Sequence, residues 1–217
     1  MADIIKLTVV LTIVSLTAAL AIAFTNSKTK DRILEQNQIA EKSALEQIMP
    51  QNSEITEMHC STAGCPSQYW IAKNENQTAY AFKISSRGYA GDIHYLVSVT
   101  EDGKIMGMSI LEQSETPGLG ARVSESISKK YIWNGLFGKK EEGLRWFTKQ
   151  FEGIDINKAI AIDKTTGEWH KLDNNKRSEL LSQNSVTAIT GSTISTRAIT
   201  NGLEKQARAY LNALQGS

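Results

Sequence analysis

The chain has 217 residues and a net charge of +1, from 24 Lys and Arg against 23 Asp and Glu. This balance, without any basic block, gives no electrostatic support for nucleic-acid binding. Once an N-terminal apolar stretch is set aside, the remaining length fits one domain of ordinary size.

The apolar stretch runs from Ile4 to Phe24 and contains one charged residue, Lys6. A helix of this length reaches about 30 Å, which is the thickness of the hydrocarbon core of a bilayer. A cleaved signal peptide is the alternative, because residues 21–23 (Ala-Ile-Ala) fit a small-x-small cleavage site. Signal peptides, however, have a shorter apolar region and a more basic start. We therefore predict a retained single-pass transmembrane helix over residues 1–24.

Two features of this stretch favour opposite orientations in the membrane. Lys6 precedes it, whereas Lys28, Lys30 and Arg32 follow it, so the positive-inside rule would keep the large domain cytoplasmic. An N-terminal span followed by a large globular domain is instead typical of a signal anchor or an uncleaved export signal. At this point both orientations stay open.

Residues 25–67 are predicted to form a stalk helix and then a loop. Apolar residues recur at roughly helical spacing as far as Pro50, which would stop the helix, and 51–67 are loop-like. This loop holds Cys60 and Cys65. Two thiols cannot complete a four-ligand zinc or iron–sulfur site by themselves. We interpret them as a small disulfide loop if the domain lies outside the cytoplasm, and as free thiols if it lies inside.

The middle of the chain has strand patterns. The last two of four predicted strands flank residues 101–103 (Glu-Asp-Gly), a good hairpin turn because Asp-Gly tolerates the required backbone angles. The four strands are expected at Tyr69–Lys73, Ala79–Ile84, Ile93–Thr100 and Lys104–Leu111.

Helices are expected to follow the strands. They cover Ser124–Trp133, part of Glu141–Phe151, and Ser195–Leu214, with short strand edges at 154–158 and 159–162. Residues 183–189 lead into the Gly-Ser-Thr turn before the last helix. Without regular βαβ alternation, this order indicates an α+β fold over residues 68–217, an antiparallel sheet with packed helices. The large aromatic residues among them, Trp133, Phe137, Trp146 and Phe147, are expected in the core.

The segment Thr190-Gly191-Ser192-Thr193 lies just before the last predicted helix. The first backbone N–H groups of a helix have no intrahelical partner and carry the positive end of its dipole, so a phosphate is stabilised there. A Thr hydroxyl at that point can itself carry the phosphate as an ester. A Ser or Thr in this place is also the usual N-cap, and both interpretations stay open on the residues alone.

Two further segments combine glycine with polar or aromatic residues. They are Glu115-Thr116-Pro117-Gly118-Leu119-Gly120 and Gly88-Tyr89-Ala90-Gly91. Glycine allows close backbone approach to a flat ligand or a phosphate, and it equally allows an ordinary tight turn.

Together these segments resemble the FMN-binding domain found in the G subunit of the Rnf electron-transport complex and in the C subunit of the sodium-pumping NADH:quinone reductase. Residues 115–120 match the loop of that family almost letter for letter, and residues 88–91 match its Gly-Tyr-x-Gly turn. Residues 190–193 match its Ser/Thr-Gly-Ala-Thr flavin-attachment motif, with Ser192 in place of Ala. The resemblance runs from the anchor to the last helix, and the length is closer to that of the Rnf subunit.

The resemblance implies FMN joined through its phosphate to Thr193 by a phosphoester bond, which a flavin transferase makes from FAD with a divalent metal. It also implies that N–H groups such as those of Ser195 and Thr196 hold the phosphate, and that residues 116–119 cover the isoalloxazine. One departure is Thr187, where the family often has an acidic residue that bears on transferase recognition. The expected flavin contacts are Thr190, Gly191, Ser192, Thr193, Ser195, Thr196, Tyr89, Glu115, Thr116, Pro117, Gly118 and Leu119.

Two cations, Arg122 and Lys129, follow the second of these segments. They are candidates to neutralise the phosphate or a flavin anion, and solvated surface charge is the plainer interpretation.

For function, the resemblance implies an electron-carrying subunit of a membrane-bound, ion-translocating ferredoxin:NAD oxidoreductase. Its partners would be other integral and peripheral subunits, because a single span cannot move ions alone. The flavin domain would then lie on the outer face of the cytoplasmic (inner) membrane. Two alternatives stay open: the equivalent flavin subunit of a sodium-pumping NADH:quinone reductase, and a flavin-free, membrane-anchored binding or regulatory module.

Overall fold

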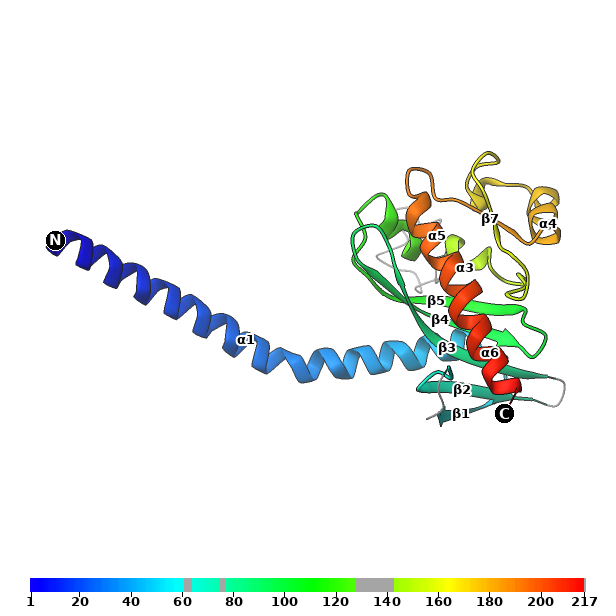
Figure 1. Cartoon of the computed structure of the whole chain (residues 1–217), viewed down its shortest axis with the longest axis horizontal. Helices are drawn as coiled ribbons and strands as arrows, with labels where there is room; N and C mark the ends of the chain where they lie inside the picture. Colours follow the sequence, from blue (N-terminus) through cyan, green and yellow to red (C-terminus); the bar gives the residue numbers. More distant parts are fainter. Residues whose placement is uncertain (61–63, 75–76, 128–142, 217) are drawn as a thin grey trace, which may run out of the picture. The chain divides into compact units, whose positions relative to one another are not determined.

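The computed structural model of the chain describes residues 1–60, 64–74, 77–127 and 143–216. It divides into two compact units, Met1–Ser43 and Ala44–Ser217. A single helix, α1 (Ala2–Ile48), supplies the first unit and the beginning of the second (Figure 1). By length and composition this helix is able to cross a membrane. Its side chains over residues 1–40 are exposed, and those between Ile4 and Phe24 form an apolar surface that needs a cover such as lipid.

The second unit is built on a five-stranded antiparallel sheet in which each strand pairs with the next along the chain (Figure 1). Its strands are β1 (Glu54–His59), β2 (Gln68–Lys73), β3 (Thr78–Arg87), β4 (Asp92–Thr100) and β5 (Ile105–Gln113). The four predicted strands are confirmed, with ends that differ by up to three residues. The prediction that 51–67 is loop-like is wrong at β1, whose side chains are mostly exposed and polar and so give no apolar alternation.

Cys60 and Cys65 follow β1 and form a disulfide, with their Cα atoms 6.0 Å apart. The bond closes the connection between β1 and β2, the two strands at one edge of the sheet.

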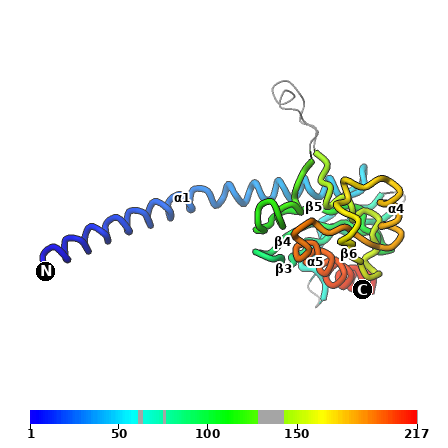
Figure 2. The backbone as a smooth tube through the Cα atoms, turned by 90° about the horizontal axis from the view of Figure 1, so that it is seen from above, coloured from blue at the N-terminus to red at the C-terminus, as the bar shows by residue number. Residues whose placement is uncertain are grey.

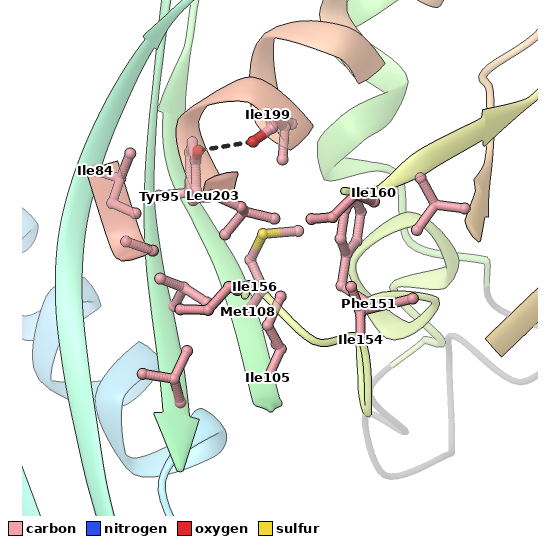
Figure 3. Packing of buried hydrophobic residues seen from close by; sticks show 14 of the residues in the cluster. Ile84, Tyr95, Ile105, Met108, Phe151, Ile154, Ile156, Ile160, Ile199 and Leu203 are labelled. Atoms are coloured by element: carbon pink, nitrogen blue, oxygen red, sulfur yellow. Dashed lines mark hydrogen bonds between the residues drawn. The ribbon is translucent and has the colours of Figure 1, made fainter. Parts of the chain in front are cut away.

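Side chains that alternate along the central strands cover both faces of the sheet. One face carries Phe82 and Ile84 of β3 and Tyr95 of β4, and it packs against C-terminal helices and against residues of the 147–160 segment (Figure 3). The other face carries Ala79, Ala81 and Leu96, and it packs against the end of α1 through Ala44, Leu45 and Ile48. The central strands of the sheet are therefore buried on both faces.

The end of α1 is fixed to its face of the sheet by a close approach at Gly107. A Cβ on Gly107 would lie 3.0 Å from the Cα of Ile48, and the Ser98 hydroxyl donates a 2.5 Å hydrogen bond to the Ile48 carbonyl. The expected stalk helix therefore ends as part of the second unit, and it stops at Ile48, two residues before Pro50.

The rest of the chain forms short helices and one small parallel pair of strands. They are η1 (Gly120–Ser124), α3 (Trp146–Lys149), β6 (Ala161–Asp163), η2 (Trp169–Lys171), α4 (Asn174–Ser182), β7 (Ser185–Thr187), α5 (Thr193–Gly202), the π-helical turn η3 (Leu203–Ala207) and α6 (Arg208–Gln215). The predicted final helix is confirmed as α5, η3 and α6 in succession.

The helix predicted to begin at Ser124 is wrong at its start. Ser124 ends the 3-10 helix η1, and Ile127 instead forms an isolated bridge with Leu144. The remainder of that helix lies outside the described residues, as do Trp133, Phe137 and Lys129. Trp146 and Phe147 are fully buried, which confirms them as core residues.

Helix α5 lies against strand β3 (Figure 2). The Tyr95 hydroxyl donates a 3.1 Å hydrogen bond to the Ile199 carbonyl (Figure 3), and the Ser86 hydroxyl is 3.1 Å from that Tyr95 hydroxyl. Gly202 permits this approach, because a Cβ there would lie under 3.0 Å from both the Ser86 and Tyr95 hydroxyl oxygens. The second half of α5 is thereby held beside the central strands β3 and β4.

Candidate functional site

The three segments singled out in the sequence converge on one cleft of about 320 Å³. The turn at 88–91 joins β3 to β4, the loop at 115–120 follows β5, and the segment at 190–193 leads into α5. The cleft is lined by Tyr89, Glu115, Thr116, Leu119, Gly120, Gly191, Ser192, Thr193 and Ile194. Residues about 100 positions apart therefore form a single concave site.

The carboxylate of Glu115 joins the three walls of this cleft. Its Oε1 atom accepts a 3.0 Å hydrogen bond from the Ala90 amide, and its Oε2 atom accepts a 2.6 Å bond from the Ser195 hydroxyl. The Gly91 amide lies at 3.5 Å. Burial alone would raise the pKa of Glu115, but the bonds from Ser195 and the backbone amides outweigh it and lower the pKa. The carboxylate is thus ionised at neutral pH and acts only as an acceptor.

Two glycines leave the space that this carboxylate occupies. A Cβ on Gly88 would lie under 3.0 Å from Glu115 Oε1, and a Cβ on Gly120 would lie under 3.0 Å from Glu115 Oε2 and 2.6 Å from Ser195 Oγ. Any side chain at either position would displace the carboxylate. Gly88 and Gly120, one from each loop segment, are therefore required by packing around Glu115.

The segment before α5 does not cap its helix in the usual way. Ser192 is at the N-cap position, but its hydroxyl bonds the Ser195 hydroxyl at 2.8 Å, and no side-chain cap bond is made there. Gly191 has a positive φ of 78°, the backbone conformation that glycine adopts most readily. Ser192 therefore does not cap α5 through its side chain, and the capping interpretation of this segment is wrong.

The N-terminus of α5 presents open backbone donors to the cleft. The Thr196 amide is the first to bond back within the helix, to the Ser192 carbonyl at 3.4 Å, so the N–H groups of Thr193, Ile194 and Ser195 have no intrahelical partner. Thr193 is half-buried at the cleft, and its hydroxyl makes no side-chain hydrogen bond within the part of the chain that the structure describes. This hydroxyl and the adjacent donors form a site suited to an anion.

Apolar side chains surround the opening of the cleft. Tyr89, Leu119 and Ile194 are 70%, 44% and 55% exposed, and each comes from a different one of the three walls. An exposed apolar set beside open backbone donors fits a ligand with one flat apolar part and one anionic part.

Several of the expected contact residues lie away from the cleft lining. Thr196 points inward, where its hydroxyl accepts a hydrogen bond from the Ile189 amide at 3.2 Å. Thr190, Pro117 and Gly118 are exposed and outside the lining. Ser195 supports the cleft through Glu115 rather than by lining it, and its backbone N–H has no partner among the described residues. Gly120 and Ile194 line the cleft and were missing from the expected contacts; Gly120 was already visible as the last residue of the loop motif.

Arg122 is neither a solvated surface charge nor a free cation at the cleft. Its guanidinium forms two hydrogen bonds with the carboxylate of Glu168, at 2.5 and 3.1 Å, and its Nε atom donates to Glu125 at 2.9 Å. The Arg122 bond and, more weakly, Lys171 lower the pKa of Glu168 to about 2, although burial opposes this shift. The ion pair holds η1, which directly follows the cleft loop, against the 168–171 segment.

Thr187, where the resembling family often has an acid, is fully buried in β7. Its amide donates to Gln150 Oε1 at 2.8 Å, and its hydroxyl accepts from the Trp169 amide at 3.0 Å. The Thr187 side chain therefore forms hydrogen bonds in the interior of the domain, three residues before the attachment segment begins.

Two protein-family models match this chain. The model of the FMN-binding domain family matches residues 88–207, which includes all three walls of the cleft. The model of the RnfG N-terminal region matches residues 1–48, the whole of α1.

Individual relatives agree with the family models. The G subunit of the Na(+)-translocating ferredoxin:NAD(+) oxidoreductase complex of Acetobacterium woodii is 28% identical over 95% of this chain and 91% of its own. The G subunit of the ion-translocating oxidoreductase complex of Pectobacterium atrosepticum is 31% identical over 65% of this chain and 77% of its own. A crystal structure of the C subunit of the Na(+)-translocating NADH-quinone reductase from Parabacteroides distasonis has the same fold, with a TM-score of 0.52 at 19% identity over 84% of this chain and 95% of its own.

Proposed function

Because this chain belongs to the FMN-binding domain family, among the G subunits of ion-translocating oxidoreductase complexes, we propose that it carries electrons through an FMN held in the cleft between Tyr89, Glu115 and Thr193. Membership of that family supports an electron-carrying flavin subunit in a redox-driven translocase. The observation that carries the assignment of the site is the convergence of all three motif segments on one cleft.

The residues of the cleft fit FMN in size and chemistry. A volume of about 320 Å³ falls in the range of small-molecule sites, which begins at about 300 Å³. The open N–H groups of Thr193, Ile194 and Ser195 suit the phosphate, and Tyr89, Leu119 and Ile194 offer apolar surface to the ring system. The flavin supplies the redox chemistry, and the protein supplies position and electrostatics.

We further propose that Thr193 holds the FMN covalently. In this step the Thr193 oxygen bonds the FMN phosphorus of FAD, the pyrophosphate P–O bond breaks, AMP leaves and the hydroxyl proton is released. A flavin transferase with a divalent metal would catalyse it. The half-buried Thr193 hydroxyl, without a side-chain partner among the described residues, is open to this reaction, whereas the neighbouring Ser192 hydroxyl is engaged by Ser195.

The remaining cleft residues position the FMN. Glu115 keeps the 88–91 turn, the 115–120 loop and the start of α5 in one arrangement by its bonds to Ala90 and Ser195. A tether at Thr193 keeps the cofactor on a site that is open to solvent at its apolar rim. Orientation of the ring relative to partner subunits then depends on these three walls.

We place the protein in the cytoplasmic membrane through α1, with the flavin domain on the outer face. The helix supports membrane anchoring, and the disulfide between Cys60 and Cys65 favours an oxidising compartment over the cytoplasm. Its partners would be the other integral and peripheral subunits of an Rnf-type complex. The Acetobacterium relative, which is named for ferredoxin and NAD(+), covers nearly the whole chain and favours that reaction over quinone reduction.

The covalent assignment is tested by Thr193→Val and Thr193→Ser, each produced as the full chain together with a flavin transferase. Valine has nearly the shape of threonine without the hydroxyl, so the fold stays intact and flavin fluorescence in denaturing gels is lost. Serine restores the hydroxyl and retains fluorescence. Covalent flavin on the valine variant would refute the role of Thr193.

A further inference from the structure

A chain of hydroxyl groups connects the cleft to Glu115, and its direction is fixed by the charge at its end. The Ser192 and Ser195 hydroxyl oxygens are 2.8 Å apart, and the Ser195 hydroxyl is 2.6 Å from Glu115 Oε2. All three side chains are buried, at 7%, 0% and 6% exposure, so water does not compete freely for these bonds.

The direction follows from counting hydrogens. An ionised carboxylate has no hydrogen to give, so Ser195 donates its single hydroxyl hydrogen to Glu115. Ser195 can then only accept from Ser192, which in turn has used its own hydrogen. Ser192, which lines the cleft, therefore has only lone pairs left on its hydroxyl oxygen. That oxygen is an acceptor, polarised through two hydrogen bonds by the Glu115 carboxylate.

We propose that Ser192 is a specificity-determining residue that accepts a hydrogen bond from a ribityl hydroxyl of the flavin. This inference rests on the proposed function. Ser192 lines the cleft and directly precedes Thr193, the proposed site of the phosphate. In FMN the ribityl chain is attached directly to the phosphate, so its hydroxyl groups are the donors closest to Thr193.

Ser192→Ala is a suitable variant, because it removes the hydroxyl and keeps the Cβ, which leaves the backbone before α5 unchanged. The Ser195–Glu115 bond, which holds the walls together, does not need Ser192.

The test measures binding of free flavins to the full chain in detergent, produced without a flavin transferase so that Thr193 is unmodified. Riboflavin has the ring and the ribityl chain, whereas lumiflavin has only the ring. The dissociation constants of both are measured for the unsubstituted chain, for Ser192→Ala and for the control Ser178→Ala, an exposed serine on α4. One hydrogen bond lost to Ser192→Ala is expected to weaken riboflavin about 3- to 10-fold and to leave lumiflavin unchanged.

The outcomes separate the two proposals. Equal weakening of riboflavin and lumiflavin by Ser192→Ala, or no weakening of either, would overturn the ribityl contact while leaving the cleft as a flavin site. If neither flavin binds even the unsubstituted chain, the Ser192 contact is overturned, because it contributes no measurable affinity. The flavin cleft itself is refuted only if the chain produced with a flavin transferase also carries no flavin. A change in Ser178→Ala as large as that in Ser192→Ala would also overturn the proposal.

Discussion

Replacing Glu115 by Gln is expected to weaken the whole cleft, because one carboxylate joins its three walls. The carboxylate accepts bonds from the Ala90 amide at 3.0 Å and the Ser195 hydroxyl at 2.6 Å. A Gln side chain has one acceptor oxygen. If that oxygen keeps the Ala90 bond, the NH₂ group faces Ser195, whose hydroxyl can turn to accept from it.

The cost is therefore the loss of charge assistance rather than an unsatisfied group. Hydrogen bonds to a charged partner contribute about 1.5–3 kcal/mol, whereas neutral ones contribute about 0.5–1.5 kcal/mol. Replacing two charged hydrogen bonds by two neutral ones lowers the stability by about 2 kcal/mol. The neutral side chain is also less costly to bury than a charge, which offsets part of this loss. We expect Glu115→Gln to lower the free energy of unfolding by about 1–2 kcal/mol at pH 7.

The assay is urea unfolding of the full chain in detergent, followed by the fluorescence of its buried tryptophans. Glu112→Gln, an exposed carboxylate three residues earlier, is the matched control and is expected to change little. The folded-state pKa of Glu115 is lowered from its ordinary value of 4.5. The charge of Glu115 therefore contributes fully to the free energy of unfolding above pH 4.5, and this contribution is lost as the pH falls through the folded-state pKa. A Glu115→Gln variant as stable as the unsubstituted chain at pH 7, or a difference that grows on acidification, would contradict this role of Glu115.

Further changes test other parts of the structure. Gly120→Ala places a Cβ under 3.0 Å from Glu115 Oε2, so it should reduce covalent flavin content measured by in-gel fluorescence; normal flavin content would contradict the role of glycine there. Glu168→Gln should lower the free energy of unfolding, measured in urea at neutral pH, by about 3 kcal/mol, because the pKa of Glu168 is lowered from 4.5 to about 2 in the folded state. That difference should persist above pH 4.5 and vanish as the pH approaches 2, and a pH-independent difference would argue against the Arg122 ion pair. Gly202→Ala should force α5 away from Ser86 and Tyr95 and lower the urea midpoint, whereas an unchanged midpoint would show that the helix can shift without cost.

The central strands were predictable because local pattern and tertiary burial agree there. In β3 and β4 alternate side chains enter the two apolar layers, and the 101–103 segment forms the turn that Asp-Gly favours. Strand β1 was missed because it lies at the edge of the sheet, with polar side chains exposed. Its pairing with β2 is a backbone property that side-chain hydropathy does not report.

The cleft was predictable as a set of three motif segments but not as a network of contacts. Glu115 and Ser195 are 80 positions apart, so no local pattern indicates that they bond. The same holds for Arg122 and Glu168, which are 46 positions apart and turn an expected surface cation into a half-buried ion pair. Thr196 resembled a ligand contact by its place at a helix start, yet the turn before α5 directs its hydroxyl inward to Ile189.

The proposed function depends above all on FMN being carried by Thr193. The most direct measurement is the intact mass of the full chain produced with a flavin transferase, followed by mapping of the modified peptide. We expect a mass gain of one FMN less one water, located on the peptide that contains Thr193. An unmodified mass under conditions that flavinylate a control protein, or a flavin on a different residue, would contradict this assignment.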